Sequence, residues 1–294
     1  MEQDDILLKV EGLSQNFGKT RAVKDVSFCL RRGEVFGLVG ESGCGKTTTG
    51  RAIMGLYPIS GGRIFFDGRQ IAGDGIRRKR GDTPGMQMIF QDPMASLDPR
   101  MTVGQSIAEG LVIRGQRDRQ ALQEKVGQML ELVGLRREYA GRYPHEFSGG
   151  QRQRIGIARA VILQPRLLIA DEPLSALDVS VQAQVLQVLE DLREKMGLTV
   201  LLIAHDLAVV KQVSHRIGVM HRGRLVEMAE AEELFRCPLH PYTRSLLSAI
   251  PIADPVAEKK RRRILYTPPE EEDGQMRQIK PGHWVFCREG EQPF

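Results

Sequence analysis

A segment of eight residues near the start of the chain has the glycine spacing of a loop that binds phosphate. The segment reads Gly40, Glu41, Ser42, Gly43, Cys44, Gly45, Lys46 and Thr47, and Thr48 follows it. Glycines allow the backbone to curve closely, so that successive N–H groups point at phosphate oxygens. A helix that begins at the end of such a loop adds its positive N-terminal end. The pattern predicts a nucleotide site in which Lys46 reaches the β- and γ-phosphates and Thr47 ligates Mg²⁺.

Two adjacent carboxylates follow an apolar segment in the middle of the chain. Residues 167–170 are all apolar, which suits a strand buried on both faces, and Asp171 and Glu172 come directly after them. Ligands bind at the carboxyl ends of the strands in parallel sheets. We expect Asp171 to hold Mg²⁺, directly or through water, and Glu172 to orient or deprotonate the attacking water. On their own, these residues would also fit a strand that meets a polar helix cap.

The chain around these motifs has the alternation of strands and helices that would position them. Strands are predicted over 7–13 and 22–30, and a strand over 34–39 leads into the glycine loop and a helix over 46–54. Further predicted elements are hairpins over 61–68 and 216–226, helices over 181–195 and 239–250, and a strand over 199–204. A strand, a glycine loop and a helix in this order indicate a parallel α/β unit.

The region that starts at residue 93 has a different, helical character. Its apolar residues, such as Ile107, Leu111, Leu130 and Val133, fall at helical spacing. We therefore predict an inserted helical subdomain at about 93–163. The predicted fold class is α/β, with a P-loop NTPase (RecA-like) core, an antiparallel β subdomain and this α-helical insert.

Composition and charge are those of an ordinary globular chain. The chain has 294 residues, of which 41% are hydrophobic, and its formal net charge is +5. Basic residues are densest at 77–80 and 259–263. We expect these runs to be solvated faces or tails. No segment approaches the length of a membrane span and the acidic N-terminus does not resemble a signal peptide. We therefore expect a cytosolic chain that reaches a membrane only by binding another protein.

The two motifs define a P-loop NTPase without distinguishing a kinase, a GTPase and a transport ATPase. GTPases use an Asn-Lys-x-Asp segment to read guanine, and the single asparagine of this chain, Asn16, lies in another context. A third motif, from Phe147 to Arg154, offers a second candidate anion site: the Ser148 hydroxyl, two glycines and the start of a predicted helix. In isolation, this turn would fit a structural helix cap.

The segment from Phe147 to Arg154 resembles the signature of ABC ATPases, with Phe147 where leucine is usual. The resemblance implies two ATP molecules sandwiched between paired ATPase subunits, each contacted by the signature of the opposite subunit. The signature residues are Ser148, Gly149, Gly150 and Gln151.

Other residues match motifs of the same family in the same order. Gln91 is similar to the Q-loop glutamine that contacts Mg²⁺ and water, and residues 175–178 resemble the D-loop. His205 matches the switch histidine that contacts the γ-phosphate, and Phe17 lies where an aromatic ring stacks on adenine. The resemblance thus implies that the catalytic residues are Glu172, His205, Gln91 and Lys46. It also implies that the Mg²⁺ ligands are Thr47, Gln91 and Asp171.

Four further segments resemble the ATPases of the oligopeptide/dipeptide importer family. They are residues 91–100, 142–148, 204–210 and 238–244. The last of these lies outside the ATPase core, so ATP chemistry does not explain it. Importers of this family typically pair two different but homologous ATPase subunits with two membrane permease subunits and an extracytoplasmic substrate-binding protein.

The end of the chain departs from that family. Many members carry a cysteine cluster there, and some bind an iron–sulfur cluster, whereas only Cys237 and Cys287 follow residue 230 in this chain. We therefore expect no iron–sulfur cluster. We assign residues 1–236 to the ATPase domain and 237–294 to a shortened extension, and we expect residues 251–294 to be a tail with little independent core. A third cysteine, Cys44, is expected to have a lowered pKa because it lies beside Lys46 at a helix start.

The function that the resemblance implies is ATP binding and hydrolysis, with Mg²⁺, by a peripheral subunit on the cytoplasmic face of the inner membrane. The subunit would energise uptake of peptides through partner membrane subunits, with no nucleic acid involved. Nickel, glutathione and glycosides remain open as substrates, as does a homomeric or heteromeric ATPase pair. The alternatives are a soluble ABC ATPase that acts on nucleic acid or ribosomes, and a small-molecule kinase.

Overall fold

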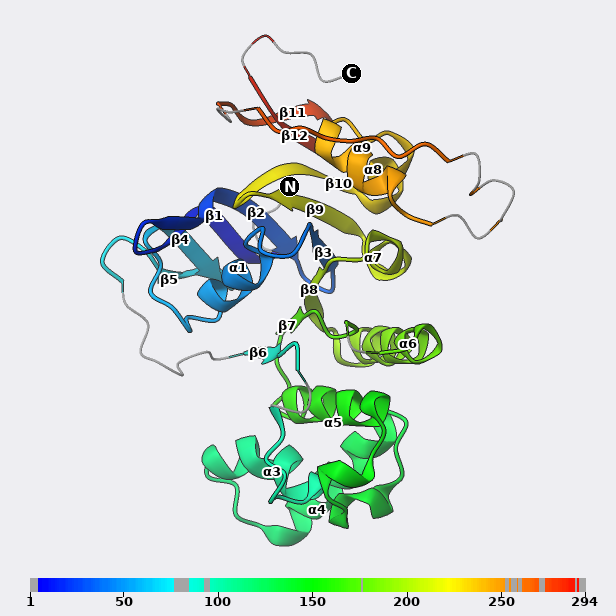
Figure 1. Ribbon diagram of the computed structural model, residues 1–294. Helices are drawn as coiled ribbons and strands as arrows, with labels where there is room; N and C mark the ends of the chain where they lie inside the picture. Colours follow the sequence, from blue (N-terminus) through cyan, green and yellow to red (C-terminus); the bar gives the residue numbers. More distant parts are fainter. Residues whose placement is uncertain are drawn as a thin grey trace. The chain divides into compact units, whose positions relative to one another are not determined.

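The computed structural model describes residues 5–76, 85–92, 96–175, 177–251, 254, 258, 261–269, 273–288 and 290. These residues form two compact units, whose elements are labelled in Figure 1. The first, the helical unit, contains residues 5–7, 31–34 and the described residues from 85 to 201. The second, the sheet unit, contains residues 8–30, 35–76 and the described residues from 202 to 290.

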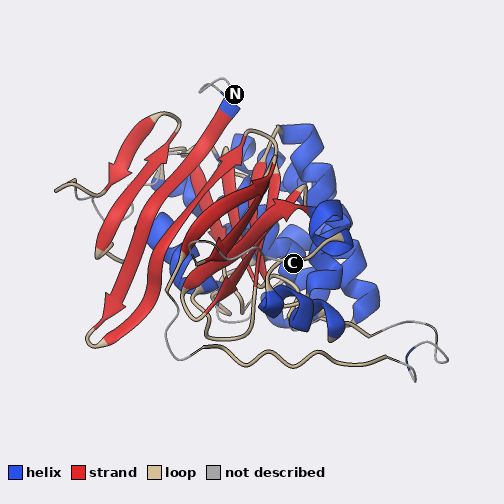
Figure 2. Cartoon of the chain, turned by 90° about the horizontal axis from the view of Figure 1, so that it is seen from above, coloured by secondary structure: helices blue, strands red, loops and turns tan. Residues whose placement is uncertain are grey.

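An antiparallel sheet makes up one part of the sheet unit, and Figure 2 shows its strands in red. Its strand order is β2-β1-β4-β5, with β1 at Ile6–Phe17, β2 at Thr20–Arg31, β4 at Gly61–Phe66 and β5 at Arg69–Ala72. Asp67 and Gly68, both with positive φ, connect β4 to β5, which confirms the predicted hairpin. From Val26 to Leu30, alternate residues of β2 are buried, as a sheet with one covered face requires.

The other part of the sheet unit carries the glycine loop. β3 (Val35–Val39) is buried along its whole length and pairs in parallel with β9 (Arg216–His221), which forms a hairpin with β10 (Arg224–Glu230). The helices here are α1 (Lys46–Ile53), α7 (Leu207–Val213), α8 (Ala231–Arg236) and α9 (Pro241–Ser248). A Cβ added at Gly37 would lie 2.2 Å from Val210, so the absence of a side chain allows α7 to pack closely on β3.

The C-terminal region differs from the expected tail. β11 (Gln275–Lys280) and β12 (His283–Cys287) form an antiparallel hairpin, and β12 pairs with β10. His283 and Val285 are buried. The strands of this hairpin were not predicted. They have no core independent of the rest of the chain, because they complete a sheet that the ATPase core begins.

The helical unit combines a parallel strand pair with a group of helices. β6 (Met86–Ile89) pairs in parallel with β7 (Leu167–Asp171), and β8 (Thr199–Ala204) starts in this unit and ends in the other. Helix α6 spans Val179–Met196, ends at Gly197 in the left-handed conformation, and confirms the predicted helix.

Helices α3 (Val103–Ile113), α4 (Arg119–Leu132) and α5 (Gly149–Val161) pack on one another, and two 3₁₀ turns lie between α4 and α5, η2 (Arg137–Gly141) and η3 (Pro144–Glu146) (Figure 1). A capping box starts α3: the Thr102 hydroxyl accepts from the Gln105 amide, and the Gln105 side chain accepts from the Thr102 amide. Asp118 caps α4 in a similar way. The predicted helical subdomain is thus present, although residues 93–95 lie outside the described residues.

The basic runs are only partly described. Residues 77–80, 259 and 260 lie outside the described residues, but Arg261 is largely buried. Its guanidinium pairs with Glu258 and donates to the carbonyls of Ser248 and Ile250, so this arginine joins Glu258 to the end of α9 rather than being solvated as expected. Among the described helices, none is long and apolar enough to cross a bilayer.

Candidate nucleotide site

The glycine loop connects β3 to α1, and glycine is required at both ends of its curve. Gly40, Gly43 and Gly45 all have positive φ, at 151°, 80° and 107°. A Cβ at Gly40 would lie 2.2 Å from the Met220 carbonyl oxygen, and one at Gly45 would lie 2.5 Å from that of Ala22. These neighbours are backbone atoms, so neither position can carry a side chain without a shift of the sheet unit's backbone.

The side chain of Lys46 folds back against the loop that precedes it. It is 3% exposed, and its ammonium donates to the carbonyl oxygens of Gly40 at 2.7 Å and Glu41 at 2.9 Å. A buried ammonium must be paired or hydrogen-bonded, and here loop carbonyls provide the acceptors. The loop therefore holds a positive charge within its curve.

The start of α1 fits a phosphate group. Its N-cap residue, Gly45, gives no side-chain acceptor to the first turn, and that turn contains no acidic residue. The first N–H groups of a helix point out of its N-terminal end, and the helix dipole favours an anion there. Thr47 and Thr48, both partly exposed, lie in the same turn and offer hydroxyl oxygens, a donor type that Mg²⁺ accepts.

Cys44 does not have the lowered pKa predicted for it. The side chain is buried, and this burial raises the pKa of the thiol, although the Lys46 ammonium, 3.9 Å from the sulfur, acts in the opposite direction. The prediction is wrong because the thiol is buried, and its desolvation outweighs the effect of the Lys46 ammonium.

Phe17, the predicted adenine contact, ends β1 and is 46% exposed. The ring of Tyr57 meets it edge to face, with ring centroids 5.4 Å apart. This contact orients the Phe17 ring while leaving part of it open to solvent, as a stacking surface would need.

In the helical unit, the structure brings Gln91 and Glu172 together. The Gln91 amide donates to the Glu172 carboxylate at 3.0 Å, although the two residues are far apart in the sequence. Asp171 is fully buried at the end of β7, and Glu172 follows with a φ of +46°, rare for a residue with a side chain. Strained backbone of this kind concentrates at functional sites, where surrounding structure fixes it.

The signature segment forms the start of α5. The Ser148 hydroxyl accepts from the Gln151 amide and the Gln151 side chain accepts from the Ser148 amide, which makes a complete capping box. Ser148 and Gly149 are exposed, whereas Gly150 is buried, with a Cβ position 2.2 Å from Val181 of α6. The capping box directly supports the interpretation of this turn as a structural helix cap. The exposed side of the turn leaves room for the predicted nucleotide contact.

The remaining predicted residues follow β7 and β8. Ser175 bonds to the carbonyl of Glu172 through its hydroxyl, at 3.1 Å, and Ala176 of the predicted D-loop lies outside the described residues. His205 is exposed directly after β8, and the next residue, Asp206, caps α7 through the Ala208 amide. The loop residues, Phe17 and His205 belong to the sheet unit, and Gln91, the signature and the carboxylates to the helical unit.

One contact of the glycine loop was not predicted. The backbone N–H of Glu41 donates to the hydroxyl of Tyr242, which lies on α9. The signal in the sequence was the segment 238–244, which matched the importer family without any role in ATP chemistry. Of the two cysteines after residue 230, Cys287 is buried and Cys237 is partly exposed, and the described residues contain no group of three or more His, Cys, Asp or Glu that could hold a metal ion.

Comparisons with known proteins agree with this geometry. Residues 23–175 match the family described as "ABC transporter", and residues 226–276 match "Oligopeptide/dipeptide transporter, C-terminal region". The chain is 53% identical to the oligopeptide transport ATP-binding protein OppF of Bacillus subtilis, over 97% of each chain.

Two solved structures share the fold. CbiO1 from Clostridium perfringens, part of the ABC transporter complex cbiONQ, is 28% identical with a TM-score of 0.72, covering 79% of this chain and 92% of that one. The ATP-binding cassette MJ0796, solved as a dimer bound to ADP and Pi, is 25% identical with a TM-score of 0.67, covering 76% and 99%.

The fold and the matches define an ATP-hydrolysing ABC ATPase, with a P-loop NTPase core, an antiparallel β subdomain and a helical insert. Within that class, the chain belongs to the family of oligopeptide and dipeptide transport ATP-binding proteins. This membership favours the importer over the alternatives of a soluble ABC ATPase and a small-molecule kinase.

Proposed function

We propose that the chain energises the import of peptides as one ATPase subunit of a membrane complex. Its partners would be a second, homologous ATPase subunit, two membrane permeases and an external binding protein, and the chain would lie on the cytoplasmic face of the membrane. The observation that carries the peptide assignment is the similarity, over nearly the whole length of both chains, to an oligopeptide transport ATP-binding protein. We also propose residues 1–236 as the ATPase domain and 237–294 as the extension.

The glycine loop would bind the phosphates of ATP. Its backbone N–H groups and the first turn of α1, whose N-cap is a glycine, suit the phosphate oxygens, and Lys46 would exchange its carbonyl partners for the β- and γ-phosphates. Phe17, held edge-on by Tyr57, would stack on the adenine ring. Thr48 would extend the phosphate contacts along the first turn.

Three oxygen donors would hold Mg²⁺: the Thr47 hydroxyl, the Asp171 carboxylate and the Gln91 side chain. Bound Mg²⁺ supplies neutralisation of phosphate charge. Glu172 would accept a proton from the attacking water, and the Gln91 amide that bonds to it fixes the direction of its carboxylate. His205 would contact the γ-phosphate.

The signature would act on the nucleotide of the paired subunit. Ser148 and Gly149 are exposed at the start of α5, where an anion can approach the helix end. The dimeric form of a related cassette with ADP and Pi supports this arrangement.

The catalytic role of Glu172 is tested by Glu172→Gln in the assembled transporter. Glutamine keeps an oxygen that can accept the Gln91 bond and removes only the negative charge. We expect ATP to bind as in the wild type and hydrolysis to fall about 10²- to 10⁴-fold. The matched control is Gln91→Glu, which changes the other member of this hydrogen-bonded pair and alters the charge beside Glu172. Wild-type turnover by Glu172→Gln would contradict the role.

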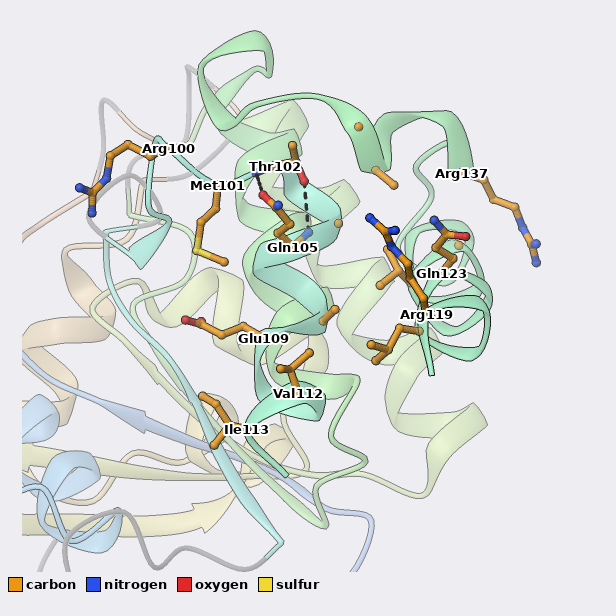
Figure 3. Close-up of a pocket in the computed structure, with 17 residues that line it drawn as sticks. Arg100, Met101, Thr102, Gln105, Glu109, Val112, Ile113, Arg119, Gln123 and Arg137 are labelled. Carbon is orange, nitrogen blue, oxygen red and sulfur yellow. Dashed lines mark hydrogen bonds between the residues drawn. The ribbon is translucent and has the colours of Figure 1, made fainter. Parts of the chain in front are cut away.

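A pocket in the helical unit is our candidate for the contact with a permease. It has a volume of about 940 Å³ and lies among α3, α4 and η2, and Figure 3 shows the lining residues. At the end of α3, Val112 and Ile113 are 50% and 79% exposed, and Met101 and Leu122 add further apolar surface. Exposed apolar residues beside a pocket are typical of a protein contact, and we propose a short amphipathic cytoplasmic helix of the permease as the occupant.

This contact is tested by Ile113→Asp. We expect ATPase activity of the isolated chain to be retained, while assembly with the permease and peptide uptake are lost. The matched control is Leu265→Asp, which changes an apolar residue that is 89% exposed in the extension. If both variants transport peptide equally well, this pocket does not bind the permease.

A further inference from the structure

The family-specific extension reaches the glycine loop directly. Tyr242, on the first turn of α9, is 2% exposed, and its hydroxyl oxygen accepts from the Glu41 N–H at 3.2 Å. The Glu41 carbonyl accepts from Lys46 at 2.9 Å and from the Cys44 N–H at 3.3 Å. The extension and the loop lysine therefore hold opposite sides of the same residue.

The surroundings of this bond contain space. A cavity of about 270 Å³ lies beside the loop, lined by Ser42 and Cys44 on one side and Tyr242 and Tyr266 on the other. Loop residues 41–43 are exposed, and both flanking glycines, Gly40 and Gly43, have positive φ. Side-chain packing on this face of the loop is thus incomplete, which gives the Tyr242 bond a large share in fixing the backbone of Glu41.

Tyr242 itself is held firmly. Its ring lies 4.0 Å from the ring of His221 and 5.6 Å from that of Tyr266. The His240 ring caps α9 by accepting from the Tyr242 N–H at 3.1 Å. The position of the hydroxyl is therefore set by the start of α9 and by an aromatic cluster, not by the loop.

A buried carboxylate connects the start of α9 to the C-terminal hairpin. Glu227 of β10 is fully buried and accepts from the backbone N–H groups of Leu239 at 2.7 Å and His240 at 3.0 Å. The Glu227 carboxylate also contacts the ring of His283 on β12, at 2.8 Å. Charge-assisted bonds of this kind are strong, so the hairpin, Glu227 and the turn before α9 behave as one rigid piece.

We propose that the C-terminal extension positions the phosphate-binding loop, with Tyr242 as the positioning residue and Glu227 as its support. The proposal rests on the proposed function, because the loop's role in binding ATP is part of it. Tyr242 acts through the peptide group that joins Gly40 and Glu41: it holds the N–H of that group, and Lys46 donates to its carbonyl oxygen, that of Gly40, at 2.7 Å. The bond therefore fixes the place from which Lys46 moves to phosphate.

The test is Tyr242→Phe in the full chain, which keeps the ring and removes the hydroxyl. Without nucleotide, we expect the Glu41 amide to exchange its hydrogen about 3- to 10-fold faster. In the assembled transporter we expect the KM for ATP to rise by a similar factor while kcat changes little, since one hydrogen bond is lost.

The matched control is Ser248→Ala, which removes bonds of the last turn of α9 to Ser245 and Ile264. It should leave both the Glu41 exchange and the KM unchanged. Equal effects of the two variants would mean that α9 stability alone matters, and unchanged exchange in Tyr242→Phe would overturn the proposal.

A second variant tests the support. Glu227→Gln weakens the acceptor for Leu239 and His240, and we expect the same rise in Glu41 exchange and in KM. Combined with Tyr242→Phe, the two changes should not add, because both act through one hydroxyl. Full additivity would contradict the relay. Lys46→Ala separates the two proposals. If the Lys46→Ala variant binds ATP as tightly as the wild type, the proposed function fails. The hydrogen exchange of the Glu41 amide without nucleotide still decides whether Tyr242 positions the loop.

Discussion

The starts of α1 and α5 look alike in sequence and differ in structure. Each follows a turn of serine and glycine, and each is a candidate anion site. Helix α1 starts at Gly45 in a left-handed conformation with no side-chain cap. Helix α5 starts at Ser148 in an extended conformation with a capping box that Gln151 completes.

The difference separates a site that is open from a site that is closed by its own residues. At α1, the N-cap residue is a glycine that makes no side-chain cap bond, which suits a ligand at this helix end. At α5, one first-turn N–H is already satisfied by Ser148, so an incoming phosphate must add to the cap or exchange with it. This suits a contact made only when a second subunit arrives.

The largest effect is expected at the open site. Gly45→Ala would place a Cβ 2.5 Å from the Ala22 carbonyl and require an unfavourable φ. We expect ATPase activity to fall about 10²- to 10³-fold, because displaced N–H donors lose the phosphate. Gly43→Ala is the matched control: it has the same sign of φ, but its Cβ would meet no atom within 4 Å. Steady-state ATPase assays compare them, and equal losses would mean that strain alone is responsible.

The closed site is probed by charge. Ser148→Asp keeps a good N-cap and adds a negative charge, whereas Ser148→Ala removes the cap. If the signature meets the nucleotide of a partner, aspartate should reduce ATPase activity of the complex about 10- to 100-fold by repelling phosphate, with no loss of Tm. Alanine should lower the free energy of unfolding by about 1 kcal/mol and cost less activity. The reverse ranking in activity would leave Ser148 as a structural cap.

A smaller effect is expected behind the signature. Gly150→Ala would bring a Cβ to 2.2 Å from Val181, a side chain that can shift. We expect a destabilisation of about 1–3 kcal/mol, measured by denaturant unfolding, from the overpacked contact of α5 and α6. Val181→Ala in the same chain should restore most of the loss, which distinguishes packing from a direct contact with nucleotide.

The smallest effect concerns Cys44. Because burial raises the pKa of its thiol, we expect maleimide to label Cys44 more slowly at neutral pH than the partly exposed Cys237, and the rate to increase with pH. Peptide mapping after limited labelling measures both sites in one sample. Faster labelling of Cys44 would show that the open loop exposes its thiol.

Local sequence patterns predicted most strands and helices of this fold. The apolar run 167–170 gave β7, and the strand predicted over 199–204 matches β8. The hairpin of β11 and β12 was missed because β11 is largely polar and because β12 pairs with β10, a distant partner that no local window contains.

The candidate site was predictable where spacing alone defines it, as in the glycine loop. Three features were not: the left-handed Glu172, the inward turn of Cys44 and the bond from Tyr242 to Glu41. Each depends on the direction of one side chain or on residues far apart in the sequence. A sequence pattern can identify such residues, but it does not predict the direction of their side chains.

The hairpin of β11 and β12 also changes which strand lies at the edge of the sheet. Without it, β10 would present unpaired backbone groups beside buried apolar residues such as Leu225 and Val226, a template for pairing with other chains. In the described part of the sheet unit, the edge is instead β11, whose residues include Gln275, Arg277 and Lys280. Charged, exposed edges disfavour pairing with other chains, so these last strands replace an apolar edge by a polar one.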